Sequence, residues 1–151
     1  MSVAFGVIYT PFIPGGSELE NGIEYAKARL PSCIRVFDAS TDALTVLDTM
    51  GEVRVYYIVG ASKRVAPGRY TRVELRSTMD YGSAYDIVEE IRASMEGSLD
   101  PLDLAKAMAA FLSAQGKDVK IIVYACGSGG CREALEEAVR EVLESTKCTE
   151  A

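Results

Sequence analysis

Stretches rich in β-branched and aromatic residues recur along the chain and predict about five strands. The stretch VRVYYIVG at 53–60 is almost uninterrupted, with Arg54 as its single charged residue. Such a run is typical of a strand that is buried on both faces of a parallel sheet. The stretch RYTRVELR at 69–76 alternates instead, which predicts an edge or half-exposed strand. The other strands are expected at 2–9, 33–37 and 119–125.

Segments with helical periodicity alternate with these strands. A helix is expected to start at Ser17, because Glu20 follows three residues later in the pattern of a capping box. Asp100 followed by Pro101 is typical of an N-cap with proline in the first turn, and the helix after it is expected to end at Gly116. Further helices are expected at about 41–50, 83–95 and 131–145.

The order of these elements, β-α-β-α-β-β-α-α-β-α, predicts the fold class. It favours an α/β protein, a three-layer α/β/α sandwich in which helices flank a mainly parallel central sheet. The chain has 151 residues, 48% of them apolar, which is enough for a hydrophobic core. No repeat or linker interrupts it, so we expect a single domain over residues 1–151.

Charge and composition limit the kinds of partner and the kinds of catalytic or metal site that are possible. The formal net charge is −6 and the basic residues are scattered, so we expect neither nucleic acid nor a membrane surface as partner. The sequence has no signal-peptide start and no apolar run long enough to cross a bilayer, which predicts a cytoplasmic protein. Histidine is absent, and this excludes histidine general bases, Ser-His-Asp and Cys-His arrangements, and imidazole metal ligands.

Four cysteines are present, at positions whose spacing fits no zinc pattern: Cys33, Cys126, Cys131 and Cys148. We expect buried or free thiols, because structural cysteine usually behaves as a small hydrophobic residue. Disulfides would be more plausible in a protein from a hyperthermophile. Whether Cys126 and Cys131 are joined stays open at this point.

The motif CGSGGCR at 126–132 lies between a buried strand and a helix. Its glycines can present backbone N–H groups to an anion at the helix N-terminus. The candidate anion-binding loop consists of Cys126, Gly127, Gly129, Gly130 and Arg132. The motif also spells C-x5-R, as in cysteine-dependent phosphatases, where a thiolate attacks phosphorus and arginine clamps the oxygens. Against this, Glu133 follows the arginine where a hydroxyl is expected, and a tight strand-to-helix turn is the simpler alternative.

Acidic residues near strand ends are a second candidate site, because convergent carboxylates can bind a divalent cation. The candidate metal ligands are Glu18, Glu20, Asp38 and Asp100. Three of them also have an ordinary structural role. Glu20 would complete the capping box, Glu18 would favour the helix dipole, and Asp100 would cap its helix.

Residues 34–145 resemble the hydrogenase maturation endopeptidases. IRVFDASTDALTVLDTM at 34–50 is similar to the family's second strand, Gly-rich turn and helix. The segment 53–75 is similar to its strand ending in Val-Asp-Ala, its loop with Pro-Gly and the following strand. SLDPLDLAKAM at 98–108 is similar to its Ser-Thr-His-x-Leu-x-Leu segment. The resemblance implies an α/β fold and, as protein partner, the large subunit of a nickel-iron hydrogenase, whose C-terminus the family trims after nickel insertion.

The departures from this pattern fall on the family's metal-binding positions. The family's opening motifs are missing from GVIYTPFIPGGSELENG, where matching Gly22 to the final glycine places Leu19 at the first ligand position. The aspartate of Val-Asp-Ala corresponds to Gly60, and the histidine corresponds to Asp100. Carboxylates are harder ligands than imidazole and suit nickel less well.

The resemblance therefore implies a divergent member with a degenerate metal site, which binds a protein partner without the standard nickel-dependent cleavage. Two alternatives remain. One is an active endopeptidase that uses nickel or another divalent metal with Glu18 or Glu20, Asp38 and Asp100. The other is a phosphatase-like enzyme built on Cys126 and Arg132.

Overall fold

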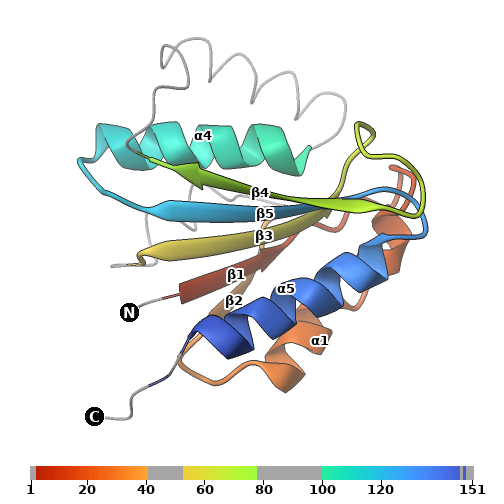
Figure 1. Cartoon of the computed structure of the whole chain (residues 1–151), viewed down its shortest axis with the longest axis horizontal. Coiled ribbons are helices and arrows are strands. Elements are labelled where there is room, and N and C mark those ends of the chain that lie inside the picture. Colours follow the sequence, from red (N-terminus) through yellow and green to blue (C-terminus); the bar gives the residue numbers. More distant parts are fainter. Residues whose placement is uncertain (1–2, 41–52, 78–99, 147, 149–151) are drawn as a thin grey trace.

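A five-stranded sheet forms the centre of the computed structural model, which describes residues 3–40, 53–77, 100–146 and 148 (Figure 1). The helices expected at 41–50 and 83–95 lie outside the described residues. The strands, in the order of the chain, are β1 Val3–Val7, β2 Arg35–Asp38, β3 Val55–Ala61, β4 Tyr70–Arg76 and β5 Lys120–Cys126.

The sheet has the order β2-β1-β3-β5-β4 and is mainly parallel. Neighbouring strands run parallel from β2 to β5, and β4 pairs antiparallel with β5 at one edge. The alternating stretch at 69–76 was expected at an edge, and its residues alternate between intermediate and exposed along most of β4. The carboxyl ends of the four parallel strands lie together, which is where ligands bind in open α/β sheets.

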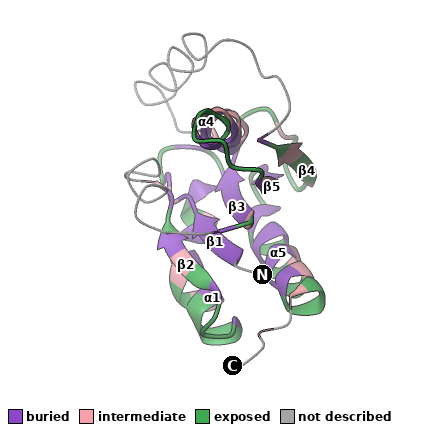
Figure 2. Cartoon of the chain, turned by 90° about the vertical axis from the view of Figure 1, so that its left-hand side faces the viewer, coloured by how far each residue is buried: buried purple, intermediate pink, exposed green. Residues whose placement is uncertain are grey.

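Helices cover both faces of this sheet and complete three layers (Figures 1 and 2). Helices α1 and α5 pack on one face, and α4 packs on the other. None of the helices in the described part of the chain is long and apolar enough to cross a membrane. The helical elements are η1 Gly16–Leu19, α1 Gly22–Arg29, α4 Pro101–Ala114 and α5 Cys131–Ser145.

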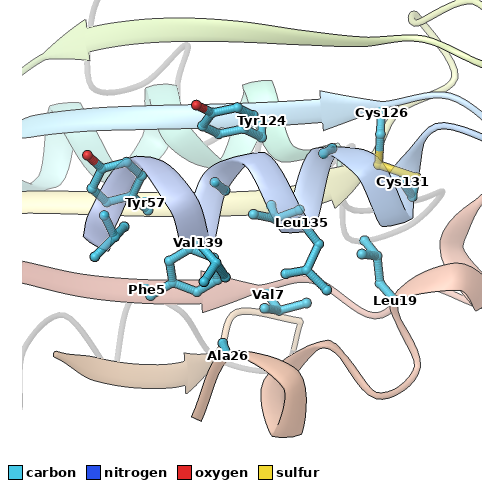
Figure 3. Close-up of a cluster of buried hydrophobic side chains, with 14 of the residues drawn as sticks. Phe5, Val7, Leu19, Ala26, Tyr57, Tyr124, Cys126, Cys131, Leu135 and Val139 are labelled. Carbon is cyan, nitrogen blue, oxygen red and sulfur yellow. A yellow bond between two sulfur atoms is a disulfide. The ribbon is translucent and has the colours of Figure 1, made fainter. Parts of the chain in front are cut away.

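Strand β3 contributes side chains to both layers of the core, as the apolar run at 53–60 predicts. Because successive side chains of a strand point to opposite faces, Tyr57 and Val59 pack toward α5, whereas Tyr56 and Ile58 pack toward α4. All four side chains are buried. Figure 3 shows the layer under α5, where Tyr57 and its neighbours contact that helix.

The first helix starts later than its sequence pattern predicts. Residues Gly16–Leu19 form a 3₁₀ turn and α1 begins only at Gly22. In a capping box the Ser17 side chain would accept the backbone N–H of Glu20. Here that N–H donates to the main-chain oxygen of Ser17 at 3.2 Å instead. The predicted capping box is therefore wrong, because the 3₁₀ turn already satisfies the donor it would bind.

All four cysteines form disulfides, so the expectation of thiols is wrong. Cys33 and Cys148 lie 6.0 Å apart at Cα and join the segment before β2 to the residues after α5. Cys126 and Cys131 lie 4.9 Å apart at Cα and close the CGSGGCR loop on itself. Both cysteines of the second pair are completely buried.

A polar network joins α5 to the sheet beside β4. The carboxylate of Glu141 accepts hydrogen bonds from Tyr124 Oη at 2.6 Å and from Arg72 Nε at 2.6 Å. Tyr57 Oη lies 3.4 Å from Ser145 Oγ in the same layer. Burial raises the pKa of Tyr57 to about 12, with the Ser145 hydroxyl opposing the shift. Burial also raises the pKa of Tyr124.

We predict that ionisation of Tyr57 lowers the free energy of unfolding at high pH. The folded-state pKa of Tyr57 lies above its ordinary value of 10.0, so its contribution is complete below that pH and is lost as pH rises through about 12. Urea unfolding should give a falling free energy of unfolding across this window. Tyr57→Phe, which cannot ionise, should fall less steeply, and an equally steep fall in that variant would contradict the assignment.

Candidate functional site

The loops that follow β1, β3 and β5 meet at the carboxyl edge of the parallel strands. The loop after β5 is the CGSGGCR motif, and it packs backbone against backbone on the loop after β3. A Cβ built on Gly127 would lie 2.2 Å from the carbonyl oxygen of Ala66, so this contact requires glycine. Gly127 N also donates to the carbonyl of Arg69 at 2.9 Å. The motif is thus buried at Gly127 and at both cysteines, whereas Ser128 and Gly129 at its tip are exposed.

The N–H groups of the predicted anion-binding loop face a carboxylate of the same chain. Glu18 Oε2 accepts the backbone N–H of Gly129 at 2.7 Å, and Oε1 accepts that of Cys131 at 3.2 Å. Cys131 begins α5, where the helix dipole favours a negative charge. Glu18 therefore caps α5, a helix distant in sequence, and not the helix that follows it.

The arrangement of Cys126 and Arg132 does not fit the phosphatase hypothesis. That chemistry needs a thiolate, and Cys126 is bonded to Cys131. The Arg132 side chain is 81% exposed, and its Nε lies 3.6 Å from Glu136 Oε1 one turn along α5. A guanidinium paired in this way is turned to solvent and does not clamp a ligand in the loop.

Asp100 caps α4, as its sequence context predicts. Its Oδ1 accepts the backbone N–H of Leu102 at 2.9 Å, and Pro101 occupies the first turn. Its Oδ2 accepts the hydroxyl of Ser62 at 2.7 Å, and Arg64 Nε lies 3.9 Å from the same oxygen. Both carboxylate oxygens are therefore engaged within the protein.

Gly60 lies beside this cap, so the fold brings together two of the positions where the family resemblance expects metal ligands. A Cβ built on Gly60 would lie 3.2 Å from Pro101 Cβ, 3.1 Å from Ile8 Cδ1 and 3.2 Å from Ile8 Cβ. Ile8 is completely buried. A side chain at position 60 would therefore fit only if Ile8 and Pro101 moved by a few tenths of an ångström.

Leu19, at the third of these positions, points into the hydrophobic core under α5. Its side chain is 1% exposed and packs in the same cluster as Cys131 and Leu135 (Figure 3). Of the three positions, Leu19 and Gly60 have no side-chain donor atom and Asp100 is used as a cap. These residues do not fit nickel binding of the family's kind.

The four acids singled out by sequence do not gather at one place: Glu18 and Glu20 line one cavity, and Asp38 and Asp100 are not among its lining residues. Asp38, at the exposed end of β2, accepts the backbone N–H of Ser40 at 2.9 Å. Glu20 lines an open cavity of about 310 Å³ between the segment 17–25 and α5. Glu18 and Asp100 bind backbone N–H groups of α5 and α4. Among the described residues, no group of three or more Cys, Asp or Glu side chains is arranged to hold a metal ion.

Ser62 is the residue at this edge that sequence reasoning missed. It is 3% exposed, donates to Asp100, and accepts the backbone N–H of Arg64 at 3.2 Å. A hydroxyl two residues after Gly60, beyond the end of a buried strand, was the available signal. The partner could not be read from sequence, because 38 residues separate Ser62 from Asp100.

We predict that Glu18→Gln destabilises the fold by about 1–2 kcal/mol, because it removes a charged acceptor from two backbone donors. Glu20→Gln is the matched control, since Glu20 is exposed and should change stability by less than about 0.5 kcal/mol. The free energies of unfolding in urea measure both effects. Equal stabilities of the two variants would contradict the role given to Glu18.

Comparison with known proteins identifies the fold. No family model matches the sequence, and no curated protein matches it. Among solved structures, the hydrogenase maturating endopeptidase HybD from E. coli superposes with a TM-score of 0.57 at 22% identity, over 96% of this chain and 91% of that chain. A hydrogenase 2 maturation peptidase from a Thaumarchaeota archaeon gives 0.53 at 14% identity, over 95% and 94%.

A solution structure of an endopeptidase from Escherichia coli gives a TM-score of 0.51 at 22% identity, over 95% of this chain and 91% of that chain. The likeness in each case spans nearly the whole of both proteins. The chain therefore has the α/β fold of the hydrogenase maturation endopeptidases, as the sequence resemblance predicts.

Proposed function

We propose that this protein is a hydrogenase-maturation-peptidase-like protein that binds a protein partner without the nickel-dependent endopeptidase activity. The large subunit of a nickel-iron hydrogenase is the candidate partner. The shared fold supports this choice of partner, because two of the similar structures are described as hydrogenase maturation peptidases. The cytoplasm is the proposed location.

The packing around Gly60 carries the proposal. Recognition of nickel in a substrate needs donor atoms that converge on the metal, and a glycine supplies none from a side chain. Ile8 and Pro101 occupy the space beside it, with approaches of 3.1–3.2 Å to a Cβ at this position. The absence of a metal-binding side chain at position 60 is thus supported by the packing around Gly60 as well as by the glycine itself.

Leu19 and Asp100, at the other two positions, also support a protein without nickel-dependent activity, each for a different physical reason. Leu19 contributes to the hydrophobic core, and a polar ligand there would have to be buried without a partner. The Asp100 carboxylate already accepts two hydrogen bonds, one on each oxygen, and these fix its orientation as the cap of α4. Restoring the site would require changes at all three positions and in their neighbours.

We predict binding without cleavage. The purified protein, mixed with a nickel-loaded large-subunit precursor that retains its C-terminal extension, should elute with it as a complex in size-exclusion chromatography. The extension should remain intact by mass spectrometry. An active maturation endopeptidase with its own precursor is the positive control for cleavage. Release of the extension by this protein would support the divergent endopeptidase, and failure to form a complex would contradict the proposed partner.

We predict that Gly60→Ala destabilises the protein by about 1–3 kcal/mol, because the added methyl would approach Ile8 and Pro101 at 3.1–3.2 Å and push them apart. Ile8→Val removes the Cδ1 atom that approaches most closely, so the double variant should lose less stability than the two single variants added together. Urea unfolding of the four proteins gives the coupling energy. If Gly60→Ala is as stable as the parent, there is room for a side chain at this position and the argument from packing fails.

A further inference from the structure

An exposed aromatic side chain stands on an ordered loop at the carboxyl edge of the sheet. Phe12 is 69% exposed, more than any other large hydrophobic side chain of the described residues. It belongs to the segment TPFIPGG that connects β1 to η1. A single exposed hydrophobic residue is ordinary on a protein surface, so its meaning depends on how it is held and on what surrounds it.

The loop holds Phe12 in place from both sides. Ile13, next to it, is 3% exposed and packs in the core under α5. The loop forms two consecutive turns. Ile13 N donates to Thr10 O at 3.1 Å, and Gly16 N donates to Ile13 O at 2.8 Å. A Cβ on Gly16 would lie 1.8 Å from Thr10 O, so the turn requires glycine.

Proline restricts the same segment, with Pro11 before Phe12 and Pro14 two residues after it. Each fixes its own backbone φ, which leaves the loop fewer alternative conformations. A side chain presented on such a backbone loses little conformational entropy when a partner covers it. Large aromatic residues presented in this way are typical anchors of protein interfaces.

The segment that follows this loop borders a cavity with acidic side chains. The segment after the loop, Ser17–Tyr25, forms one wall of the 310 Å³ cavity, and α5 forms the other. Phe12 is five residues from Ser17, which places it at most about 18 Å from the rim along the chain. The charged side chains that line the cavity are three carboxylates and one guanidinium: Glu18, Glu20, Glu136 and Arg132.

Among these, Glu20 has its charge available for a partner. Glu18 binds the N–H groups at the start of α5, and Glu136 is paired with Arg132. Glu20 is exposed, and none of the described residues donates a hydrogen bond to it or forms an ion pair with it. The cavity therefore presents negative charge in a chain whose net charge is already −6.

We infer that Phe12 and the cavity bearing Glu20 form one protein-docking surface, whose partner offers an apolar pocket for Phe12 and a basic side chain for the cavity. The inference deepens the proposed function and depends on it, because it assigns the surface that would hold the large-subunit precursor. The complementary charges give orientation and a faster association, and the aromatic anchor gives most of the affinity.

The experiment measures the Kd of the nickel-loaded precursor for the parent protein and four variants by isothermal titration calorimetry. Phe12→Ala should weaken binding at least tenfold, and Glu20→Gln should weaken it several-fold at low salt. The matched controls are Leu143→Ala, an exposed hydrophobic residue 46% accessible on α5, and Glu24→Gln, an exposed acid outside the cavity. Both controls should stay within about twofold of the parent.

Salt separates the two contributions, because exposed charge pairs are screened by added ions. Raising the sodium chloride concentration should weaken binding of the parent and of Phe12→Ala, and should weaken binding of Glu20→Gln less. Circular dichroism of each variant checks that the fold is unchanged. The same salt dependence in the parent and in Glu20→Gln would overturn the role of the cavity.

The outcomes distinguish this surface from the proposed function. Binding by the parent that Phe12→Ala does not weaken overturns the surface and leaves the proposed function standing. No binding by the parent overturns both. Sedimentation velocity tests a second copy of the chain as the occupant, since a dimer of the parent that Phe12→Ala dissociates would replace the partner proposed here.

Discussion

The hydrogen bonds from the backbone N–H groups of Gly129 and Cys131, at the start of α5, to the Glu18 carboxylate hold the carboxyl edge of the sheet together. They link the segment after β1 to the segment after β5, which are separated by β3 in the sheet. The disulfide between Cys126 and Cys131 closes the loop that presents these N–H groups. A charged acceptor at a helix N-terminus and a covalent bond thus act on the same few residues, and the loops around them are positioned by this contact.

This stabilisation uses the side chains that could otherwise carry chemistry. A carboxylate that accepts two N–H groups is held in one orientation by them, and a cysteine in a buried disulfide is not a nucleophile. The same holds for Asp100, whose oxygens cap α4 and accept the Ser62 hydroxyl. An edge of this kind is suited to presenting a fixed surface, because the carboxylates of Glu18 and Asp100 are already engaged within the protein.

Local sequence patterns predicted most of the fold. The uninterrupted run at 53–60 and the alternation at 69–76 are properties of single strands, and both predictions are confirmed by β3 and β4. The cap by Asp100 is equally local. The capping box at Ser17 failed because backbone hydrogen bonds in the 3₁₀ turn took the donor first. The contacts of Glu18 and Ser62 join residues distant in sequence, and no periodicity within either segment carries that information.

The two disulfides differ in what they stabilise, and neither was predictable from spacing. In the chain-entropy account, a disulfide stabilises the fold by restricting the unfolded chain. Joining Cys33 to Cys148 across 115 residues contributes about 5 kcal/mol, whereas the short loop closed by Cys126 and Cys131 contributes about 2 kcal/mol. The first contribution is as large as the whole stability of many domains.

The long bond therefore acts on the fold, and the short bond acts mainly on the local geometry of one loop. That loop supplies the N–H groups for Glu18, and through Glu18 it fixes the segment that leads into α1. An edge held by a disulfide, a carboxylate and close glycine contacts keeps its shape through backbone and partly buried groups, so its exposed side chains are not needed for that purpose.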